Sequence, residues 1–198
     1  MKQSELDKIL KLHKKWINDE EGGVKADLTG ADLSGLNLSN ADLSYANLEG
    51  AKLNIANLTS ANLRYTKLNN AILNGANLNG ADLSNADLSY ANLVYTNLIS
   101  TDLRNANLNT VNLNYADLRK ANLRYVNLIN ANLIETNLKC ADLSYAFLND
   151  VNLSYAFLND ANLSYADLTD AILINTNLSN TILKCANLSG ASLYNTIF

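Results

Sequence analysis

Leucine occupies every fifth position of the chain from Leu28 to Leu193, and Phe198 takes the next place in the register. Ala stands two residues before most of these leucines, Asn or Asp stands one before, and the two residues that follow are mostly polar. On an α-helix, five residues advance about 500°, so the leucines would wind around all sides. On a flat strand, an odd period would send successive leucines to opposite faces. The period predicts a chain that bends once per unit and keeps every leucine inside, which is a solenoid.

Proline and glycine follow the same register. Proline, which would remove an N–H from a ladder between coils, is absent from the chain. Six of the eight glycines stand two residues after a leucine, and they share that place with Asn and Asp, which also tolerate turn dihedrals. Larger residues replace some inward alanines, and we interpret them as local widening of the core. They are Leu36, Val111, Val126, Val151, and the threonines at 66, 96, 101, 136, 176, 181 and 196.

The units ADLSG, ADLSY, ANLNG and ANLSY resemble the A(D/N)LXX signature of pentapeptide-repeat proteins. The resemblance covers residues 26–198. It implies an all-β solenoid, a right-handed quadrilateral parallel β-helix with four units in each of about nine coils. At the strand spacing of about 4.8 Å per coil, such a rod is roughly 40 Å long. Residues 1–25 would form a short N-terminal capping α-helix and its connector.

The segment before residue 26 carries a helical pattern in place of the repeat. Ser4 with Asp7 predicts a variant capping box, and Gly22-Gly23 predicts the end of the helix. An apolar stripe predicts a cap over the open edge of the first coil, with the tryptophan supplying most of the buried area. Its residues are Leu6, Ile9, Leu10, His13, Trp16 and Ile17, and we expect His13 to be partly buried. Four nearby lysines leave a partner-binding or membrane-surface helix as the alternative, which the acidic residues at 19–21 weaken.

Few residues in the chain suit catalysis or metal binding. His13 is the only histidine, and we expect it to be structural. One histidine and two cysteines, Cys140 and Cys185, do not make a typical zinc site. In coils of four units these cysteines fall on different sides, too far apart for a disulfide. We expect a cytoplasmic protein with free thiols, no cofactor, no membrane segment and no enzymatic activity.

Twenty residues per coil sort the outward residues onto four sides, which we number along the chain. Side 1 holds Leu28 and its equivalents every twenty residues, side 2 holds Leu33, side 3 Leu38 and side 4 Leu43. Side 1 has six carboxylates against one lysine, side 2 two against one, side 3 two against three cations, and side 4 four against four. Side 1 is therefore the candidate acidic face. Its carboxylates belong to Asp27, Glu49, Asp87, Asp150, Asp167 and Asp170.

Side 4 aligns tyrosines with basic residues. Tyrosines one coil apart should stack at the strand spacing and stabilise the exterior. They also form a candidate interaction surface, because Tyr and Arg are favoured at interfaces. Its residues are Tyr45, Tyr65, Tyr125, Tyr145, Tyr165, Arg64, Arg104 and Arg124. The mixture also suits single-stranded nucleic acid, but the four carboxylates of side 4 argue against direct nucleic-acid binding. A second tyrosine set, Tyr95, Tyr115 and Tyr155, falls on another side.

Two function classes remain. The first is a non-catalytic protein-interaction or scaffold module whose protein partner is unknown. The alternative, which comes from the resemblance, is a DNA mimic that binds DNA gyrase, as in quinolone resistance. Duplex DNA carries one charge per about 1.7 Å, so a rod of this length would imitate roughly two dozen charges. The repeats carry fourteen carboxylates offset by nine cations, which makes mimicry the weaker hypothesis.

The last coils are unusually apolar at places that are polar elsewhere. No helix follows Phe198 in the sequence, so the apolar residues predict end-to-end dimerisation through the C-terminal coil. The candidate dimer end consists of Ile182, Tyr194, Ile197 and Phe198. A small exposed patch on a monomer is the alternative.

Overall fold

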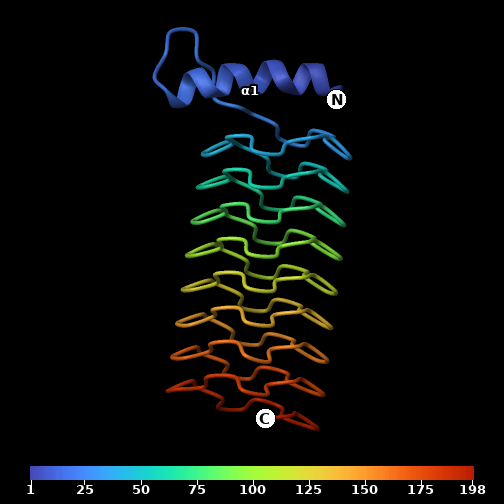
Figure 1. Cartoon of the computed structure of the whole chain (residues 1–198), viewed down its shortest axis with the longest axis vertical. Helices are drawn as coiled ribbons and strands as arrows, with labels where there is room; N and C mark the ends of the chain where they lie inside the picture. The colour runs from blue at the N-terminus through green and yellow to red at the C-terminus, as the bar shows by residue number, and fades with distance from the viewer.

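The computed structural model describes residues 1–198 and contains one helix, α1 (Gln3–Ile17), above a rod of stacked coils. Parallel bridges join residues twenty apart along the whole rod, from Asp27 with Asn47 to Asn177 with Ile197. Each bridge is a single residue, so the β-structure consists of isolated bridges rather than long strands. Four units therefore complete one coil, and the rod is the right-handed quadrilateral β-helix that the family resemblance implies. In Figure 1 the coils stack in register below α1, which lies across one end.

Three backbone hydrogen bonds tie each unit to its neighbours. The leucine N–H donates to the Asx carbonyl of the next coil, as in Leu113 to Asn132 at 2.8 Å. The Asx N–H donates to the preceding coil, as in Asn112 to Ala91 at 3.0 Å. The N–H two residues after the leucine also donates to the next coil, as in Tyr115 to Ile134 at 3.0 Å. These three bonds per unit hold each interior coil to the coils above and below it.

The chain turns at the second residue after each leucine. The alanine N–H of the next unit closes the turn on the leucine carbonyl, and the residue before that alanine has φ near +60°, as at Tyr115 (61°) and Gly30 (63°). This is the place where a type II turn needs the left-handed region, which explains the glycines, asparagines and aspartates found there. The same turn also holds tyrosines and even the β-branched Ile55 (58°), so the stacked coils impose the conformation on them.

The leucine and alanine columns form one continuous core along the rod. The leucines of the interior coils are fully buried. Threonines at the alanine places donate their hydroxyl to the leucine carbonyl of the preceding coil, as Thr136 Oγ1 does to Leu113 O at 3.0 Å. A larger residue in this column is therefore accommodated without an unpaired polar group.

The cap helix differs from the sequence prediction at both ends. It begins at Gln3, and Glu5, not Asp7, accepts the N-terminal hydrogen bond, from Lys2 N at 3.0 Å. It ends at Ile17 rather than at Gly22-Gly23. Asp19 takes the left-handed place (φ 56°) of a Schellman turn, in which Asp19 N donates to Trp16 O and Glu20 N donates to Lys15 O. A short polar residue thus supplies the helix stop that the sequence pattern assigns to glycine.

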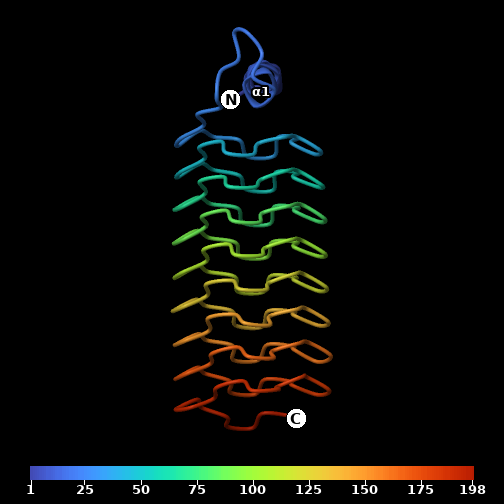
Figure 2. The ribbon, with the colours of Figure 1, turned by 90° about the vertical axis from the view of Figure 1, so that its left-hand side faces the viewer.

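The buried face of α1 follows the predicted stripe and differs from it at Trp16. Leu6 and His13 are fully buried, whereas Trp16 is 38% exposed and is not the main buried residue. Ile9 and Leu10 are partly buried against the core, and Ile17 is half-buried. Figure 2, which looks along α1, shows the helix centred above the first coil. Burying a leucine contributes about 1.5–3 kcal/mol, so Leu6 anchors the cap.

Two side chains of α1 replace the backbone partners that a preceding coil would provide. Gln3 pairs with the Asn37 peptide, because its Nε2 donates to Asn37 O and its Oε1 accepts from Asn37 N, both at 2.9 Å. His13 Nδ1 accepts from Ala26 N, and His13 Nε2 donates to Ser44 O, both at 3.1 Å. In later coils, the backbone groups equivalent to Asn37 N, Asn37 O and Ser44 O bond to a neighbouring coil, and the group equivalent to Ala26 N bonds to a turn carbonyl. The cap is therefore held by pairing with the ladder as well as by apolar contact.

We predict that the cap docks less firmly in mild acid. Burial lowers the pKa of His13 from its ordinary 6.5, against smaller opposing effects of the Ser44 bond and Asp42, while Lys25 lowers it further. A detached His13 takes up a proton as the pH falls below 6.5, but docked His13 must stay neutral so that Nδ1 can accept. The stability of docking is therefore complete above pH 6.5 and falls between 6.5 and the lower pKa of the docked form.

Hydrogen exchange of the first-coil amides at pH 5 and pH 7.5 measures this effect. His13→Gln is the matched variant, because a glutamine amide can accept from Ala26 N and donate to Ser44 O without titrating. Protection of these amides that is equal at the two pH values in the original protein would contradict the prediction.

Candidate functional site

Side 4 carries two separate stacks of tyrosines. Tyr45 and Tyr65 stack with ring centroids 4.9 Å apart. Tyr125, Tyr145 and Tyr165 form the second stack at 5.0 and 4.9 Å. Asn85 and Asn105 occupy the same row between the stacks. The predicted tyrosine ladder is therefore confirmed, but it is divided, and its spacing equals the spacing of the coils.

The first stack continues into the cap. Trp16 meets the edge of Tyr45, with centroids 6.4 Å apart, and stacks on His13 at 5.5 Å. Lys25 Nζ lies 5.4 Å from the centre of the Trp16 ring. The helical pattern predicted that Trp16 is buried in the apolar stripe, and it gave no sign of this aromatic contact with side 4. Its helical position beside the start of side 4 could be found only once the direction of α1 across the first coil was known.

Three of the four cations of side 4 lie over tyrosine rings. Arg64 and Arg124 each place their guanidinium carbon 5.8 Å from the centre of the next tyrosine ring, Tyr65 and Tyr125. Lys184 lies 5.9 Å from the centre of the Tyr165 ring. These distances are within the range of cation–π attraction.

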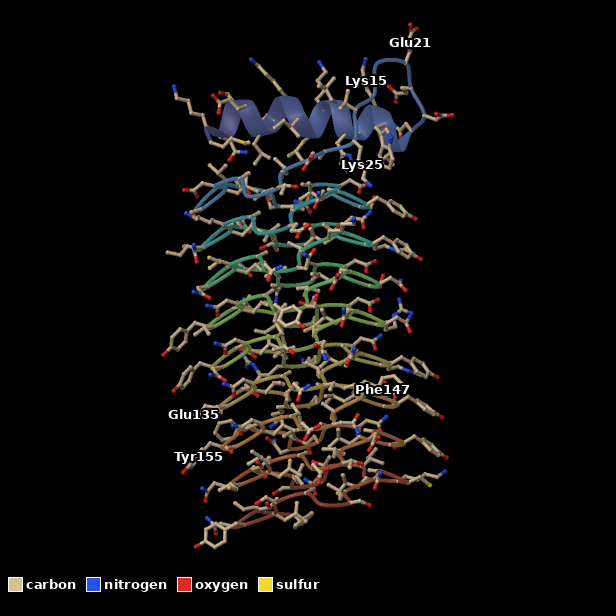
Figure 3. The ribbon with its side chains drawn as sticks, turned by 180° about the vertical axis from the view of Figure 1, so that it is seen from behind. Lys15, Glu21, Lys25, Glu135, Phe147 and Tyr155 are labelled. Atoms are coloured by element: carbon tan, nitrogen blue, oxygen red, sulfur yellow. The ribbon has the colours of Figure 1, made fainter.

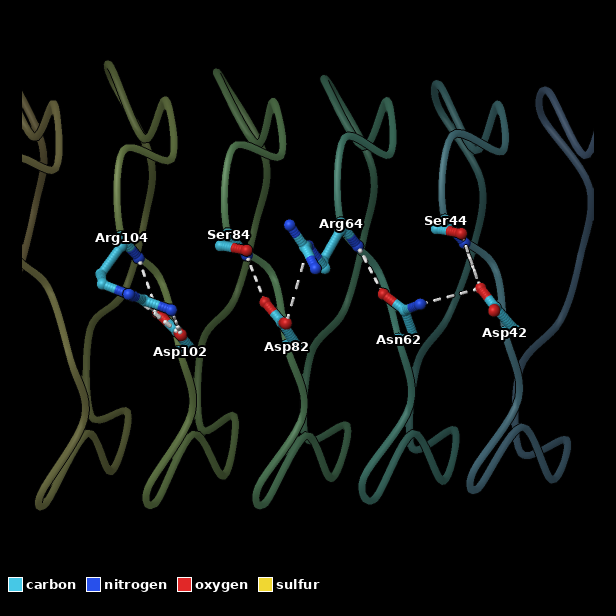
Figure 4. Close-up of polar contacts among 8 residues, drawn as sticks. All are labelled: Asp42, Ser44, Asn62, Arg64, Asp82, Ser84, Asp102 and Arg104. Atoms are coloured by element: carbon cyan, nitrogen blue, oxygen red, sulfur yellow. Dashed lines mark hydrogen bonds and ion pairs between the residues drawn. The ribbon is translucent and has the colours of Figure 1, made fainter. Parts of the chain in front are cut away.

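The carboxylates of side 4 differ in how they meet these cations (Figure 4). Arg104 binds its own neighbour Asp102, at 2.6 Å. Partial burial alone would raise the pKa of Asp102, but the hydrogen bonds and charge of Arg104 outweigh it and hold that pKa below the ordinary value. Arg64 makes only a long contact of 3.9 Å with Asp82, and Arg124 has no carboxylate within ion-pair distance. Arg104 is thus neutralised, whereas Arg64 and Arg124 remain available to a partner.

A shallow hollow of about 140 Å³ adjoins the first tyrosine stack. It is lined by Ser44, Tyr45, Asn62, Arg64 and Tyr65. The Asn62 amide donates to Asp42 of the preceding coil at 3.0 Å, which fixes the floor of the hollow. The hollow has aromatic and cationic walls and suits a side chain of a partner better than a substrate.

Some carboxylates of the candidate acidic face on side 1 accept hydrogen bonds from donors close to them. Asp27 accepts from Thr29 N and Thr29 Oγ1, and these bonds lower its pKa. Asp167 accepts from Thr169 and from the amides of Asn149 and Asn187, and its pKa is also lowered. The remaining four carboxylates are Glu49, Asp87, Asp150 and Asp170. Side 1 carries no carboxylate between Asp87 and Asp150, so its charge lies in two groups and forms no continuous row.

The C-terminal coil exposes the residues of the candidate dimer end. Tyr194 and Phe198 are the most exposed of them, at 76% and 65%, and Ile182 and Ile197 are more than half exposed. The two cysteines are free and exposed, and they lie on sides 3 and 4. No group of three or more His, Cys, Asp or Glu side chains is arranged to hold a metal ion. The structure has no helix that is both long and apolar enough to span a membrane.

Comparisons with known proteins agree with this architecture. The family model for pentapeptide repeats matches residues 24–54, 56–93, 91–124, 116–154 and 161–198, with eight copies. A comparison with the curated proteins found no match.

Among solved structures, the chain is similar to HetL, a pentapeptide repeat protein involved in heterocyst differentiation regulation in the cyanobacterium Nostoc sp. strain PCC 7120. The identity is 31%, over 93% of this chain and 94% of HetL, with a TM-score of 0.58. It is also similar to full-length QnrB1, a plasmid-mediated fluoroquinolone resistance protein, with 18% identity, coverage of 86% and 84%, and a TM-score of 0.69. The second likeness concerns the fold alone. Its repeats, its coils and these matches show that the chain belongs to the pentapeptide-repeat family.

Proposed function

We propose that this protein is a non-catalytic interaction module that binds a partner protein along side 4. The observation that carries the proposal is the pair of exposed tyrosine stacks with Arg64 and Arg124 over their rings, of which Arg124 has no ion pair and Arg64 only a long one. Tyr and Arg side chains supply most of the binding energy at many interfaces. Stacked rings are also rigid, so little conformational entropy is lost when a partner binds. The likeness to HetL supports a regulatory role exerted through such binding.

The backbone strengthens the proposal by excluding another kind of recognition. Along the sides of the rod, most backbone groups of the interior coils are already hydrogen-bonded, as Tyr125 N is to Ser144 O at 3.2 Å, and the turn-residue carbonyls that stay free recur only once per unit. A partner cannot add a strand to such a surface. Side chains alone must carry specificity on side 4, and the tyrosines and arginines are its largest exposed side chains.

Quantitative capture from the native host tests side 4. The side-4 variant combines Arg124→Ser, Tyr125→Asn and Tyr145→Asn, which copy residues found elsewhere in the same rows, Ser144 and Asn105. We expect its specific partner to be recovered at least about tenfold less than with the original protein, as for loss of interface hot spots. Asp150→Asn on side 1 is the control and should retain the partner. If every captured protein binds the side-4 variant equally, side 4 is not the binding surface.

The gyrase alternative has one supporting observation, the acidic excess of side 1. Its two charge groups and the local bonds of Asp27 and Asp167 leave it far from the even charge of a DNA duplex. We therefore expect no effect of micromolar protein on DNA supercoiling by gyrase. Inhibition that disappears in an Asp167→Asn/Asp170→Asn variant would instead support DNA mimicry.

The exposed apolar coil supports a separate proposal, a homodimer through the candidate dimer end. Unpaired backbone groups beside Ile182, Ile197 and Phe198 would then meet the same groups of a second copy around a two-fold axis. Sedimentation of the original protein should give a dimer, and Ile197→Asp/Phe198→Asp should give a monomer. Tyr145→Asn serves as a control that should stay dimeric. Two monomeric proteins of equal mass would refute the dimer.

A further inference from the structure

Side 2 differs from the other three sides in its lack of charge. Among its units from residue 71 to residue 195, Glu135 is the only charged residue. Over the same stretch, side 4 carries six charged residues, from Asp82 to Lys184. Loss of charge in the centre, with aromatic residues in its place, is the composition that distinguishes the core of a protein interface from other surface.

Exposed aromatic and aliphatic residues take the place of the missing charges. Tyr95 and Tyr155 are 66% and 52% exposed, and Tyr95 stacks on Tyr115 with centroids 4.9 Å apart. Ile134 lies between Tyr115 and Tyr155 in the chain and is half-buried on the same side. Figure 3 shows Glu135 and Tyr155 projecting from the same edge of the rod. The face is a straight apolar stripe with one negative charge near its middle.

The asparagines that precede the leucines either donate their amide to the preceding coil or have no acceptor for it in the chain, and several of the second kind lie on side 2. On side 1 the Asn107 amide donates to Asp87 of the preceding coil at 3.0 Å, and on side 4 the Asn162 amide donates to Asp142. On side 2 the carbonyl oxygens of Asn92, Asn112 and Asn152 accept from their own turns, as at Asn112 Oδ1 with Asn114 N at 3.2 Å. Their Nδ2 groups have no acceptor in the chain, so a row of amide donors flanks the apolar stripe.

We propose that side 2 is a docking surface for an amphipathic α-helix of another protein, with one Lys or Arg of that helix facing Glu135. Strand addition is excluded, because every backbone N–H in the four units of side 2 that end at Tyr95, Tyr115, Glu135 and Tyr155 already donates within the rod, as Tyr115 N does to Ile134 O. A helix laid along the rod advances about 5.4 Å per turn, close to the 4.9 Å between Tyr95 and Tyr115. One side chain per helical turn can therefore meet each coil from Tyr95 to Tyr155. Over these three intervals the length of the helix and the length of the coil stack differ by roughly 1.5 Å in total.

The single charge sets the chemistry of the occupant. A glutamate surrounded by uncharged residues favours a cation and rejects a carboxylate placed against it. A second copy centred on this stripe by a two-fold axis at Glu135 would bring two carboxylates together, which disfavours self-association there. Side-chain acceptors of the helix, such as Gln or Ser, would meet the free asparagine amides.

A displayed library of 18-residue helical peptides tests the proposal while the natural partner is still unidentified. The original protein is the target, and Tyr115→Asn/Tyr155→Asn is the counter-target. These substitutions copy Asn175 and Asn195 of the same row, whose backbone has the same left-handed turn. We expect peptides that bind the original protein at least about tenfold tighter than the double variant. They should carry apolar residues at i, i+3 or i+4, and i+7 together with a Lys or Arg.

Glu135→Lys provides the charge test, since Lys120 shows that lysine is accepted at this turn place. It should weaken the selected basic peptides by about tenfold and favour versions with Glu in place of the cation. Tyr145→Asn on side 4 should leave peptide binding unchanged, so failure of this proposal is distinguishable from failure of the side-4 proposal.

Three results would overturn the proposal. The first is a selection that yields no peptide preferring the original protein, and the second is binding that Glu135→Lys leaves unchanged. The third is sedimentation showing a self-association that the double tyrosine variant abolishes, which would make a second copy the occupant. Circular dichroism and thermal melting of each variant confirm that its rod is intact.

Discussion

Every residue of the rod is placed by its hydrogen bonds to residues about twenty positions away. These bonds fix the coil spacing, and the coil spacing brings rings such as Tyr145 and Tyr165 to 4.9 Å, the distance of ring stacking. The left-handed turn after each leucine is a consequence of the same stacking, since tyrosine and isoleucine adopt it beside glycine. Because the ladder is repeated without interruption, the outward side chains form straight rows along the rod. A partner of the protein therefore meets a row of side chains and not a single residue.

Those rows give the four sides separate characters. Side 4 offers rings covered by cations, and side 1 offers carboxylates bound to local donors. Side 2 offers an almost uncharged stripe. A solenoid contacts its surroundings through flat faces rather than a central pocket. Two of these faces lie on different sides of the rod, so occupancy of one leaves the other free, which is the geometry needed to hold two partners at once.

The sequence predicted the rod closely because the repeat is local and uninterrupted. The leucine period gave the core, and a coil of twenty residues correctly placed Tyr125 above Tyr145 and Cys140 on a different side from Cys185. The cap was predicted less well, because it has no repeat to constrain it. Its stop depended on Asp19 in a left-handed turn that glycine was expected to provide, and the exposure of Trp16 depended on how α1 crosses the coil. The ion pair between Arg104 and Asp102 likewise depends on side-chain rotamers, which a pattern of residue types does not encode.

The imitation of a peptide group by Gln3 has a consequence for assembly. A parallel ladder is a template, and any exposed rung can recruit further chain, as in fibril growth. By presenting an amide to the Asn37 peptide, α1 satisfies that rung without offering a new one beyond it. The helix therefore bonds to this rung as another coil would, but it cannot itself be extended as a coil.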